Sequence, residues 1–244
     1  PTAISAWDAF DFGKADYTGQ VLILAHQIAL PADAADKLEN FVRLGGTLIA
    51  DGLTGYYDEQ ARAAPITGFA LEKVLGGKVA EYKMEGDKVS VALGNLTLPG
   101  HAWRGYLVPT TGSLLAGSNT SVHALRHQLG KGQAFWIPTM AGLGSRLHGN
   151  APLAAWLQTV LAAAKAKPAV RLQNHLPMVL LQTLEAGKGF ITVAINKSGK
   201  AVTAKLELPA GLQPVLLTGS AGSVADKAIT LQPEATVVVG WLNK

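Results

Sequence analysis

The spacing of apolar and polar residues changes once along this chain, near residue 167. Before that point, continuous apolar runs at Val21–Ala25, Thr47–Ala50 and Ala134–Ile137 predict strands that are covered on both faces. Between the first two runs, apolar residues recur at helical spacing from Ala34 to Gly45. The pattern therefore predicts a strand–helix–strand unit, whose crossover we expect to be right-handed.

Turn-forming residues mark where the predicted helices begin and end. Leu30–Asp33, with a proline in the first turn, opens the first helix, and Gly45–Gly46 closes it. A short helix is predicted over Phe69–Leu75, and a longer one after Asn150, with an apolar stripe to Ala164. The segment between these two helices has no helical period, and it predicts short strands at Lys78–Tyr82, Val89–Leu93, Asn95–Leu98, Tyr106–Val108 and Val122–Leu129.

Past the predicted linker Lys165–Pro168 no helical pattern remains. The sequence there predicts short strands separated by glycine- and proline-rich turns: Met178–Leu184, Phe190–Ile195, Ala201–Leu208, Val215–Leu217, Ala228–Leu231 and Ala235–Leu242. Such spacing is typical of a small antiparallel sandwich. We therefore predict two domains, an α/β domain over residues 1–167 and an all-β antiparallel sandwich over residues 168–244.

Composition narrows the classes of function. Apolar residues make up 48% of the 244 residues and charged residues 16%, so we expect a sizeable core and little disorder. The net charge of +4 comes from scattered lysines and arginines with few aromatic neighbours, so nucleic-acid binding is not expected. The lack of cysteine excludes disulfides, thiolate metal sites and a cysteine nucleophile. No apolar run approaches the ~20 residues of a membrane-spanning helix, so no membrane partner is expected.

The first residues, Pro1–Ala3, include no initiator methionine and no signal-peptide pattern. We expect them to belong to the middle of a longer protein, with any targeting signal upstream. The sequence predicts no cellular compartment. The segment that follows, Ser5–Gly19, mixes aromatic and acidic residues and predicts either a lead-in packed over a sheet edge or a loop that faces carbohydrate.

Polar residues end three of the predicted strands. His26, Asp51 and Thr139 each follow an apolar run, and ligands of open α/β sheets bind at the carboxyl ends of the strands. Two interpretations stay open at this point. The residues could form a site in which His26 is a base, or they could be polar because loops begin there.

Other candidate motifs are weaker. No GxSxG or GxCxG elbow occurs, and the nearest stretch, Gly142–Ser145, neither directly follows a predicted strand nor opens a clear helix. In a strand, His123 and His127 lie about 13 Å apart, too far to share a metal ion. Gly130–Gly132 lacks the P-loop pattern and predicts a turn. Asp58 and Glu59 are adjacent, which is a poor arrangement for the two carboxylates of a glycosidase.

Short motifs along most of the chain resemble the trimerisation domain of family 42 glycoside hydrolases, the β-galactosidase group. In the first domain they are Leu24–His26, Leu30–Asp33, Gly45–Leu48, Thr54–Gly55 with Asp58–Glu59, Leu71–Gly76 and Leu129–Ala134. In the second they are Leu217–Gly219 and Leu231–Pro233, which are similar to the C-terminal β domain of that family. The resemblance fails before Ser5, where the first strand and helix of the family should stand.

The resemblance implies an assembly role. It implies a three-layer fold of the class I glutamine amidotransferase (flavodoxin-like) type, without the nucleophile of those enzymes. The two catalytic glutamates of the family lie in an upstream (β/α)₈ barrel, so no residue here inherits a catalytic role, and no cofactor or metal is expected. The implied partners are that barrel, neighbouring subunits of a homotrimer and, through the parent enzyme, a galactoside-type sugar. The residues expected at the active-site mouth or the subunit interface are His26, Asp51, Tyr56, Tyr57, Asp58 and Glu59.

Two alternatives stay open beside the assembly role. The chain could be a stand-alone carbohydrate-binding or scaffold module, for which exposed Trp7, Tyr56, Tyr57 and Trp103 would be the binding feature. It could also be an amidotransferase-like or other hydrolase that uses His26 or Ser145.

Overall fold

The computed structural model describes residues 6–64, 68–166, 170–174, 176–186, 189–219 and 221–243. Pro1–Ala3 and part of the predicted linker Lys165–Pro168 lie outside these residues. The described chain divides into two compact units. One is Asp11–Ala166, and the other holds the described residues after Ala166 together with the few before Asp11, where a 3₁₀ turn spans Trp7–Ala9.

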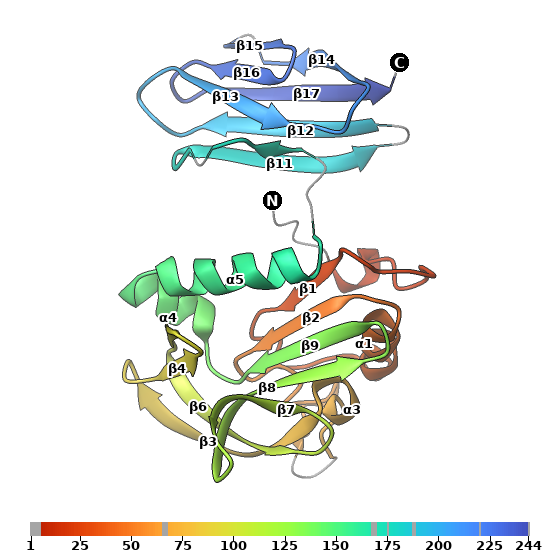
Figure 1. Cartoon of the computed structure of the whole chain (residues 1–244), viewed down its shortest axis with the longest axis vertical. Helices are drawn as coiled ribbons and strands as arrows, with labels where there is room; N and C mark the ends of the chain where they lie inside the picture. Colours follow the sequence, from red (N-terminus) through yellow and green to blue (C-terminus); the bar gives the residue numbers. More distant parts are fainter. Residues whose placement is uncertain are drawn as a thin grey trace. The chain divides into compact units, whose positions relative to one another are not determined.

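A mixed seven-stranded sheet forms the centre of the first unit. Its order is β1-β2-β9-β8-β6-β3, with β7 on β8. Neighbours β1, β2 and β9 run parallel and the other pairs run antiparallel, and Figure 1 shows β1, β2, β9 and β8 following one another across the sheet. The strands are β1 (Val21–Leu24), β2 (Thr47–Asp51), β3 (Gly77–Gly86), β6 (Ala102–Pro109), β7 (Ser113–Ser118), β8 (Ser121–Leu129) and β9 (Gly132–Ile137). A separate hairpin consists of β4 (Ser90–Leu93) and β5 (Leu96–Pro99).

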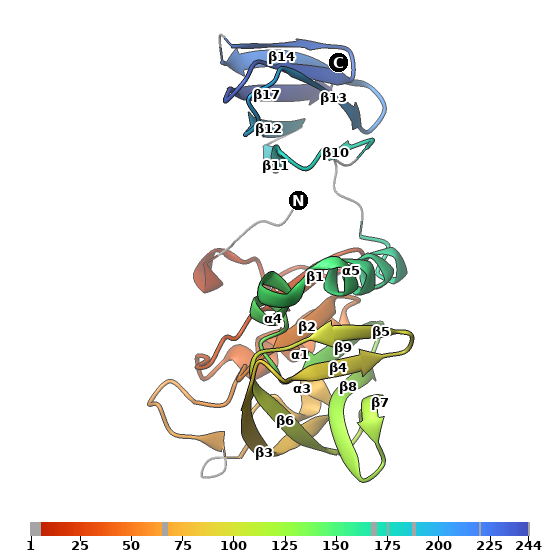
Figure 2. The same ribbon diagram turned by 90° about the vertical axis from the view of Figure 1, so that its left-hand side faces the viewer.

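Helices and the hairpin cover the two faces of this sheet, because side chains alternate along its strands. On one face, Phe135 and Ile137 of β9 join a buried cluster with Trp156 of α5 and with the β4–β5 hairpin, which Figure 2 shows in front of β8 and β9. On the other, Phe69 stacks on Trp136 at 4.9 Å between ring centres. The described helices are α1 (Ala34–Arg43), α3 (Glu72–Leu75), α4 (Ala141–His148) and α5 (Ala151–Ala163).

The predicted α/β class is confirmed at the coarse level of a mixed fold rich in sheet, with separate antiparallel sheets. Several details of the prediction are wrong. Strand β1 was expected to be covered on both faces, but it lies at the edge of the sheet and Ile23 is 41% exposed. The first helix begins at Ala34, so Pro31 precedes it instead of lying in its first turn. Gly142–Ser145 lies inside helix α4, which begins four residues after the end of β9 at Ile137, although no helix was predicted there. The two glycines of α4 lower its helix propensity and hide its period.

The second unit is a sandwich of two four-stranded antiparallel sheets. Their orders are β10-β13-β16-β15 and β11-β12-β17-β14. The strands are β10 (Arg171–Leu172), β11 (Val179–Ala186), β12 (Gly189–Asn196), β13 (Val202–Glu207), β14 (Leu212–Thr218), β15 (Gly222–Ala225), β16 (Ala228–Leu231) and β17 (Thr236–Asn243). Strands β10 and β15 were not predicted, since they are short and carry little apolar pattern.

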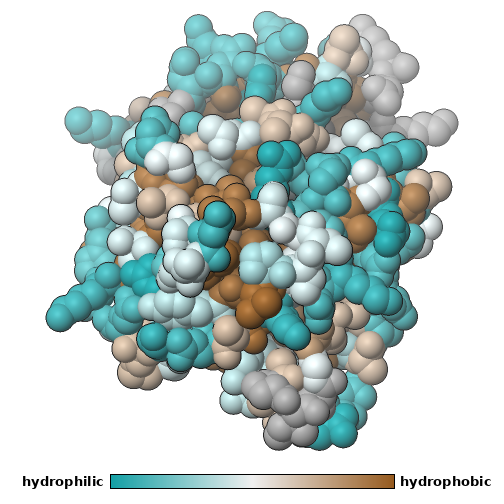
Figure 3. Space-filling model, turned by 60° about the horizontal axis from the view of Figure 1, so that its bottom comes forward, coloured by the Kyte–Doolittle hydropathy of each residue, from teal (hydrophilic) through white to brown (hydrophobic). Residues whose placement is uncertain are grey.

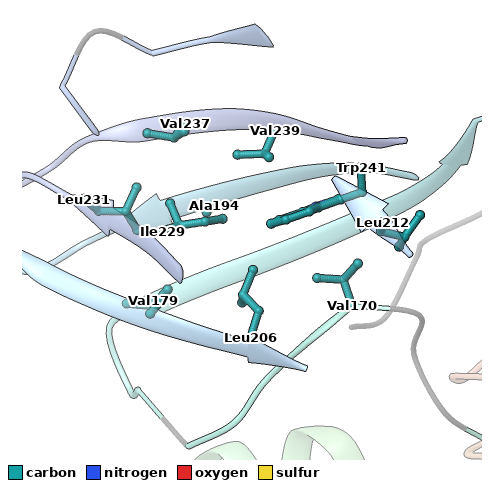
Figure 4. Packing of buried hydrophobic residues seen from close by; sticks show 11 residues of the cluster. Val170, Val179, Ala194, Leu206, Leu212, Ile229, Leu231, Val237, Val239 and Trp241 are labelled. Atoms are coloured by element: carbon teal, nitrogen blue, oxygen red, sulfur yellow. The ribbon is translucent and has the colours of Figure 1, made fainter. Parts of the chain in front are cut away.

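Buried side chains from both sheets fill the space between them (Figure 4). Leu206 and Ile229 come from one sheet, and Ala194, Val239 and Trp241 come from the other. Every one of these five side chains is fully buried. This core is independent of the first unit, because each sheet covers the inner face of the other.

Candidate functional site

The structure brings together the polar residues that end the parallel strands. The backbone N–H of His26, just after β1, donates a hydrogen bond of 2.6 Å to Oδ1 of Asp51 at the end of β2. The N–H of Gly52 donates to the carbonyl of Thr139, which follows β9, at 2.9 Å. The carboxyl ends of β1, β2 and β9 are therefore joined into one network, as the strand-end rule predicts.

The turn after β2 holds the ring of His26 at its nitrogen Nδ1. The N–H of Leu53 donates to Nδ1 at 3.1 Å, so a neutral ring carries its proton on Nε2. Gly52 lies directly beside the ring, and a Cβ added there would stand 2.2 Å from Nδ1. The backbone of His26 itself takes a left-handed φ of 51°. The imidazole thus supports the turn after β2, and Nδ1 is not available as a base.

Asp51 links two strands to helix α4. Burial raises the pKa of its carboxyl above the ordinary value of 3.8, and the N–H groups of His26, Gly142 and Ala141 oppose that shift because they favour the charged form. Ala141 and Gly142 open α4, where N–H groups without a partner inside the helix and the helix dipole favour an anion. Asp51 therefore stabilises the start of a helix that the sequence did not predict.

Thr54 holds the loop after β2 in place through hydrogen bonds, and its side chain is fully buried. Its hydroxyl oxygen lies 2.6 Å from the carbonyl of Asp51 and 3.1 Å from that of Leu24, and it accepts the N–H of Gln27 at 3.1 Å. The N–H of Gly55 donates to the carbonyl of Gln27 at 2.9 Å. Neither Thr54 nor Gly52 was singled out from the sequence, since a single threonine or glycine in a loop is not informative by itself.

Three tyrosines pack edge to face beside this network. The ring of Tyr56 lies 5.1 Å from that of Tyr57 and 5.4 Å from that of Tyr82, measured between ring centres. The hydroxyl of Tyr82 donates to the carbonyl of Gly52 at 3.1 Å. Burial, with the nearby Tyr56, raises the pKa of Tyr82 above its ordinary value. The cluster gives the loop a rigid aromatic base, and both Tyr56 and Tyr57 remain partly exposed.

The adjacent acids Asp58 and Glu59 are engaged in separate local contacts. Asp58 accepts the N–H of Arg62 at 2.8 Å and its guanidinium Nε at 2.8 Å, and the backbone bond is the main reason why the pKa of Asp58 lies below its ordinary value. Glu59 accepts the N–H of Ala32, just before α1, at 3.1 Å. The two carboxylates thus shape the loop and anchor it to the helix, an arrangement unlike a glycosidase pair, which flanks one sugar from two sides.

The remaining candidates from the sequence also have structural contacts. His127 is buried, and its ring Nδ1 lies 3.0 Å from the carbonyl of Val74. The side chain of Ser145 is buried inside α4, which is unlike the exposed serine of a nucleophile elbow. Gly130 and Gly132 form the β8–β9 turn against the backbone of Arg43 and Gly46, where a Cβ would meet main-chain atoms within 3 Å.

The described ranges hold neither a cluster of metal ligands nor a membrane-spanning helix. Within these ranges, no three histidine, cysteine, aspartate or glutamate side chains are grouped as a metal ion requires. The helices there are too short or too polar to cross a membrane.

Sequence reasoning missed a groove of about 460 Å³ on the first unit. Its walls come from α1, from α3 and the residues before it, and from Thr110–Thr111, so no single stretch of sequence signals it. Asp36, Glu39 and Glu72 lie along it with one lysine, Lys73. Figure 3 views the molecule from the end where β3 and β7 lie in Figure 1, and it shows apolar surface gathered near the centre of a mostly hydrophilic face.

Comparison with known proteins agrees with the resemblance seen in the sequence. The family model of the β-galactosidase trimerisation domain matches residues 14–166. No curated protein matches the chain in sequence. Among solved structures, the β-galactosidase from Bacillus circulans sp. alkalophilus aligns with a TM-score of 0.67 and 15% identity, over 91% of this chain and 33% of that chain.

Two further β-galactosidases show the same extent of similarity. A catalytic mutant of Gan42B from G. stearothermophilus aligns with a TM-score of 0.65 and 17% identity, over 91% of this chain and 32% of that chain. The enzyme from the Antarctic haloarchaeon Halorubrum lacusprofundi aligns with a TM-score of 0.58 and 16% identity, over 90% of this chain and 31% of that chain. This chain therefore spans about a third of the length of these structures, and at such identities they show a common fold. Because the family model covers more than half of the sequence, the chain belongs to the β-galactosidase trimerisation domain family.

Proposed function

We propose that this chain is the non-catalytic assembly region of a β-galactosidase-like glycoside hydrolase. The observation that carries the proposal is the match of residues 14–166 to the trimerisation domain. The parent protein would hold the catalytic (β/α)₈ barrel in the part that these relatives have and this chain lacks, and a galactoside would be bound there. The partners of the chain are then that barrel and two further copies of itself.

The site geometry supports a structural role for the strand ends. Nδ1 of His26 accepts a hydrogen bond from the turn after β2, the carboxylate of Asp51 accepts N–H groups of His26 and of the start of α4, and Ser145 is buried. An amidotransferase-like hydrolase would need an exposed nucleophile beside a free base. The arrangement instead favours a rigid platform under the loop that begins at Leu53.

We further propose the domain limits and the finer fold type. The first domain would be residues 1–167, of the amidotransferase-like three-layer type, and the second the sandwich of residues 168–244. The few described residues before Asp11 differ from this division, since they group with the second unit. The parallel core β1-β2-β9 with helices on both of its faces supports this fold type. The change from a mixed sheet to a purely antiparallel sandwich supports the boundary.

Tyr56, Tyr57, Asp58 and Glu59 are the residues that we propose at a subunit interface or at the mouth of the active site. They lie on a loop that is fixed by Thr54 and by the bond from Ala32 to Glu59, yet their side chains keep exposed surface. Rigid, partly exposed aromatic groups are enriched in interfaces, because little conformational entropy is lost when they bind. His26 and Asp51 would then act indirectly, by holding this loop.

Sedimentation of the 244-residue chain, together with an assay on a chromogenic galactoside, tests the proposal. We expect particles built of three chains, or of a multiple of three, and no turnover. Tyr57→Asp should dissociate the trimer, whereas Lys205→Asp, an exposed charge change in the second unit, should leave it intact. A chain that sediments only as a monomer or dimer would contradict the assembly role, and so would turnover that His26→Ala abolishes.

A further inference from the structure

The two outer faces of the β-sandwich differ in character. On the sheet β10-β13-β16-β15, the outward residues of β13 are Thr203, Lys205 and Glu207, all exposed. Arg171 of β10 forms an ion pair with Glu207. This is the polar surface expected where an antiparallel sheet faces water.

The outer face of the sheet β11-β12-β17-β14 is mainly apolar, and its polar members, which include Gln182, Gln213 and Thr236, are uncharged. The strand registers place Leu184 opposite Ile191 and Ile191 opposite Gly240, and side chains paired in this way point to the same side of a sheet. By the same registers, side chains of all four strands of this sheet lie on its outer face. We call this surface the apolar face, and its main side chains are Leu180, Leu184, Ile191, Val193, Val238 and Leu242.

Much of the apolar face is open to solvent in this chain. Leu184 and Leu217 are each 53% exposed, and Leu242 is 51% exposed. The side chain of Leu217 lies over Gly240, 3.5 Å from where a Cβ would stand, so the surface is continuous from β17 to β14. None of the described positions on this face carries a charge. Contiguous exposed apolar patches of this kind mark interaction sites.

We propose that the apolar face binds the same face of a second copy of this chain. The chain carries a net charge of +4, so two copies repel each other weakly at long range. A two-fold contact places the same patch against itself, and an uncharged patch brings no like charges together. A partner selected by charge would instead require charged anchors on this surface, and the described positions offer none.

The size of the face fits such a contact. Four strands spaced about 4.8 Å apart and about seven residues long cover roughly 19 by 24 Å. The leucines and valines standing on that area bring its accessible surface towards the roughly 600 Å² per copy of a small specific interface. Two sheets packed in this way would repeat the arrangement already present inside each sandwich, about 10 Å apart.

Sedimentation velocity of the full 244-residue chain tests the contact, with Leu184→Glu/Leu242→Glu as the variant. Each copy would bring two carboxylates into an apolar interface, so we expect the dimer dissociation constant to rise at least about 100-fold. Thr203→Glu, on the polar face of the same sandwich, is the matched control and should sediment like the unaltered chain. An unchanged urea transition at low protein concentration would show that the variant folds.

The particle masses separate this proposal from the assembly role of the first unit. If both hold, the unaltered chain forms particles of more than three copies, six where two trimers close on each other, and the variant forms particles of three. If only the apolar-face contact holds, the change is from two copies to one. Particles of equal mass for the unaltered chain and the variant would overturn the contact, and the face would then be covered by another part of the parent protein.

Discussion

The strand ends of the first unit and the apolar face of the second differ in what remains free to bind a partner. The strand ends look like a binding site and the apolar face does not, but the structure leaves more surface open on the apolar face. His26, Asp51 and Thr54 look like catalytic groups, but Nδ1 of His26, Oδ1 of Asp51 and the hydroxyl of Thr54 take part in hydrogen bonds inside the domain. The apolar face looks like ordinary strand sequence, yet about half of the surface of Leu184 or Leu242 is open. Polarity alone is therefore a poor guide to where this molecule binds.

The difference follows from what burial costs each kind of group. A buried polar atom must find a hydrogen-bond partner, and such a partner lies within reach wherever three strand ends and a helix start meet. An apolar side chain stabilises the fold only when other groups cover it, and a small domain cannot cover all of its apolar side chains by itself. The polar region is complete by itself, whereas the apolar region needs a partner.

The largest expected effect comes from adding one methyl group to the strand-end network. Gly52→Ala places a Cβ 2.2 Å from Nδ1 of His26, at a φ of 59°. We expect a loss of about 3 kcal/mol in the free energy of unfolding, from the clash together with the left-handed backbone. Urea denaturation measures it.

Gly86→Ala is the matched control for this substitution. Gly86 has the same φ of 59°, and a Cβ there would meet nothing within 4 Å. We therefore expect only the conformational cost of about 1 kcal/mol. Equal losses for the two variants would mean that the ring of His26 moves aside freely, and the network would then be looser than the hydrogen bonds indicate.

Asp51 offers a second way to examine the network, through the pH dependence of stability. Because burial raises its pKa in the folded state above the ordinary 3.8, the folded chain binds the proton more tightly than the unfolded chain. The contribution of Asp51 is thus largest below pH 3.8 and is lost as the pH rises through the folded value. The difference in unfolding free energy between the unaltered chain and Asp51→Asn should fall as the pH rises from about 3 to 6.

Asp58 should show the opposite sign. Its pKa is lowered, chiefly by the N–H of Arg62, so its contribution is present above pH 3.8 and is lost as the pH falls through the folded value. The same difference measured with Asp58→Asn should therefore rise with pH. Two curves of the same sign would contradict the claim that burial dominates at one carboxylate and hydrogen bonding at the other.

Much of the fold follows from apolar period, and the errors have physical causes. Strands β2 and β9 were predicted because continuous apolar runs suit strands that are covered on both faces. Helix α4 was missed because Gly142 and Gly144 interrupt its pattern. Gly144 is required there, since a Cβ would stand 2.5 Å from the backbone of Gly100. Tertiary packing selected the residue that local propensity disfavours.

The candidate site was predictable in position and not in role. The strand-end rule placed His26 next to Asp51, and the structure agrees. The role of Asp51 depends on the start of α4, and that of His26 depends on Gly52 lying under its ring. Both contacts join segments far apart in sequence. The strand Phe190–Ile195 was predicted as part of an antiparallel sandwich, but the sequence did not predict how much of its outer face stays open.

The smallest expected effect concerns the apolar face in the isolated chain. Leu184 is 53% exposed on the edge strand β11, so Leu184→Thr removes few contacts and retains a residue that favours strands. At a protein concentration low enough to keep monomers, we expect the free energy of unfolding to change by less than about 0.5 kcal/mol. Leu231→Thr, in the core between the two sheets, should cost about 3 kcal/mol under the same conditions. A loss at Leu184 close to that at Leu231 would mean that the residue is already covered within one chain, and the contrast between an internally satisfied polar region and an open apolar face would fail.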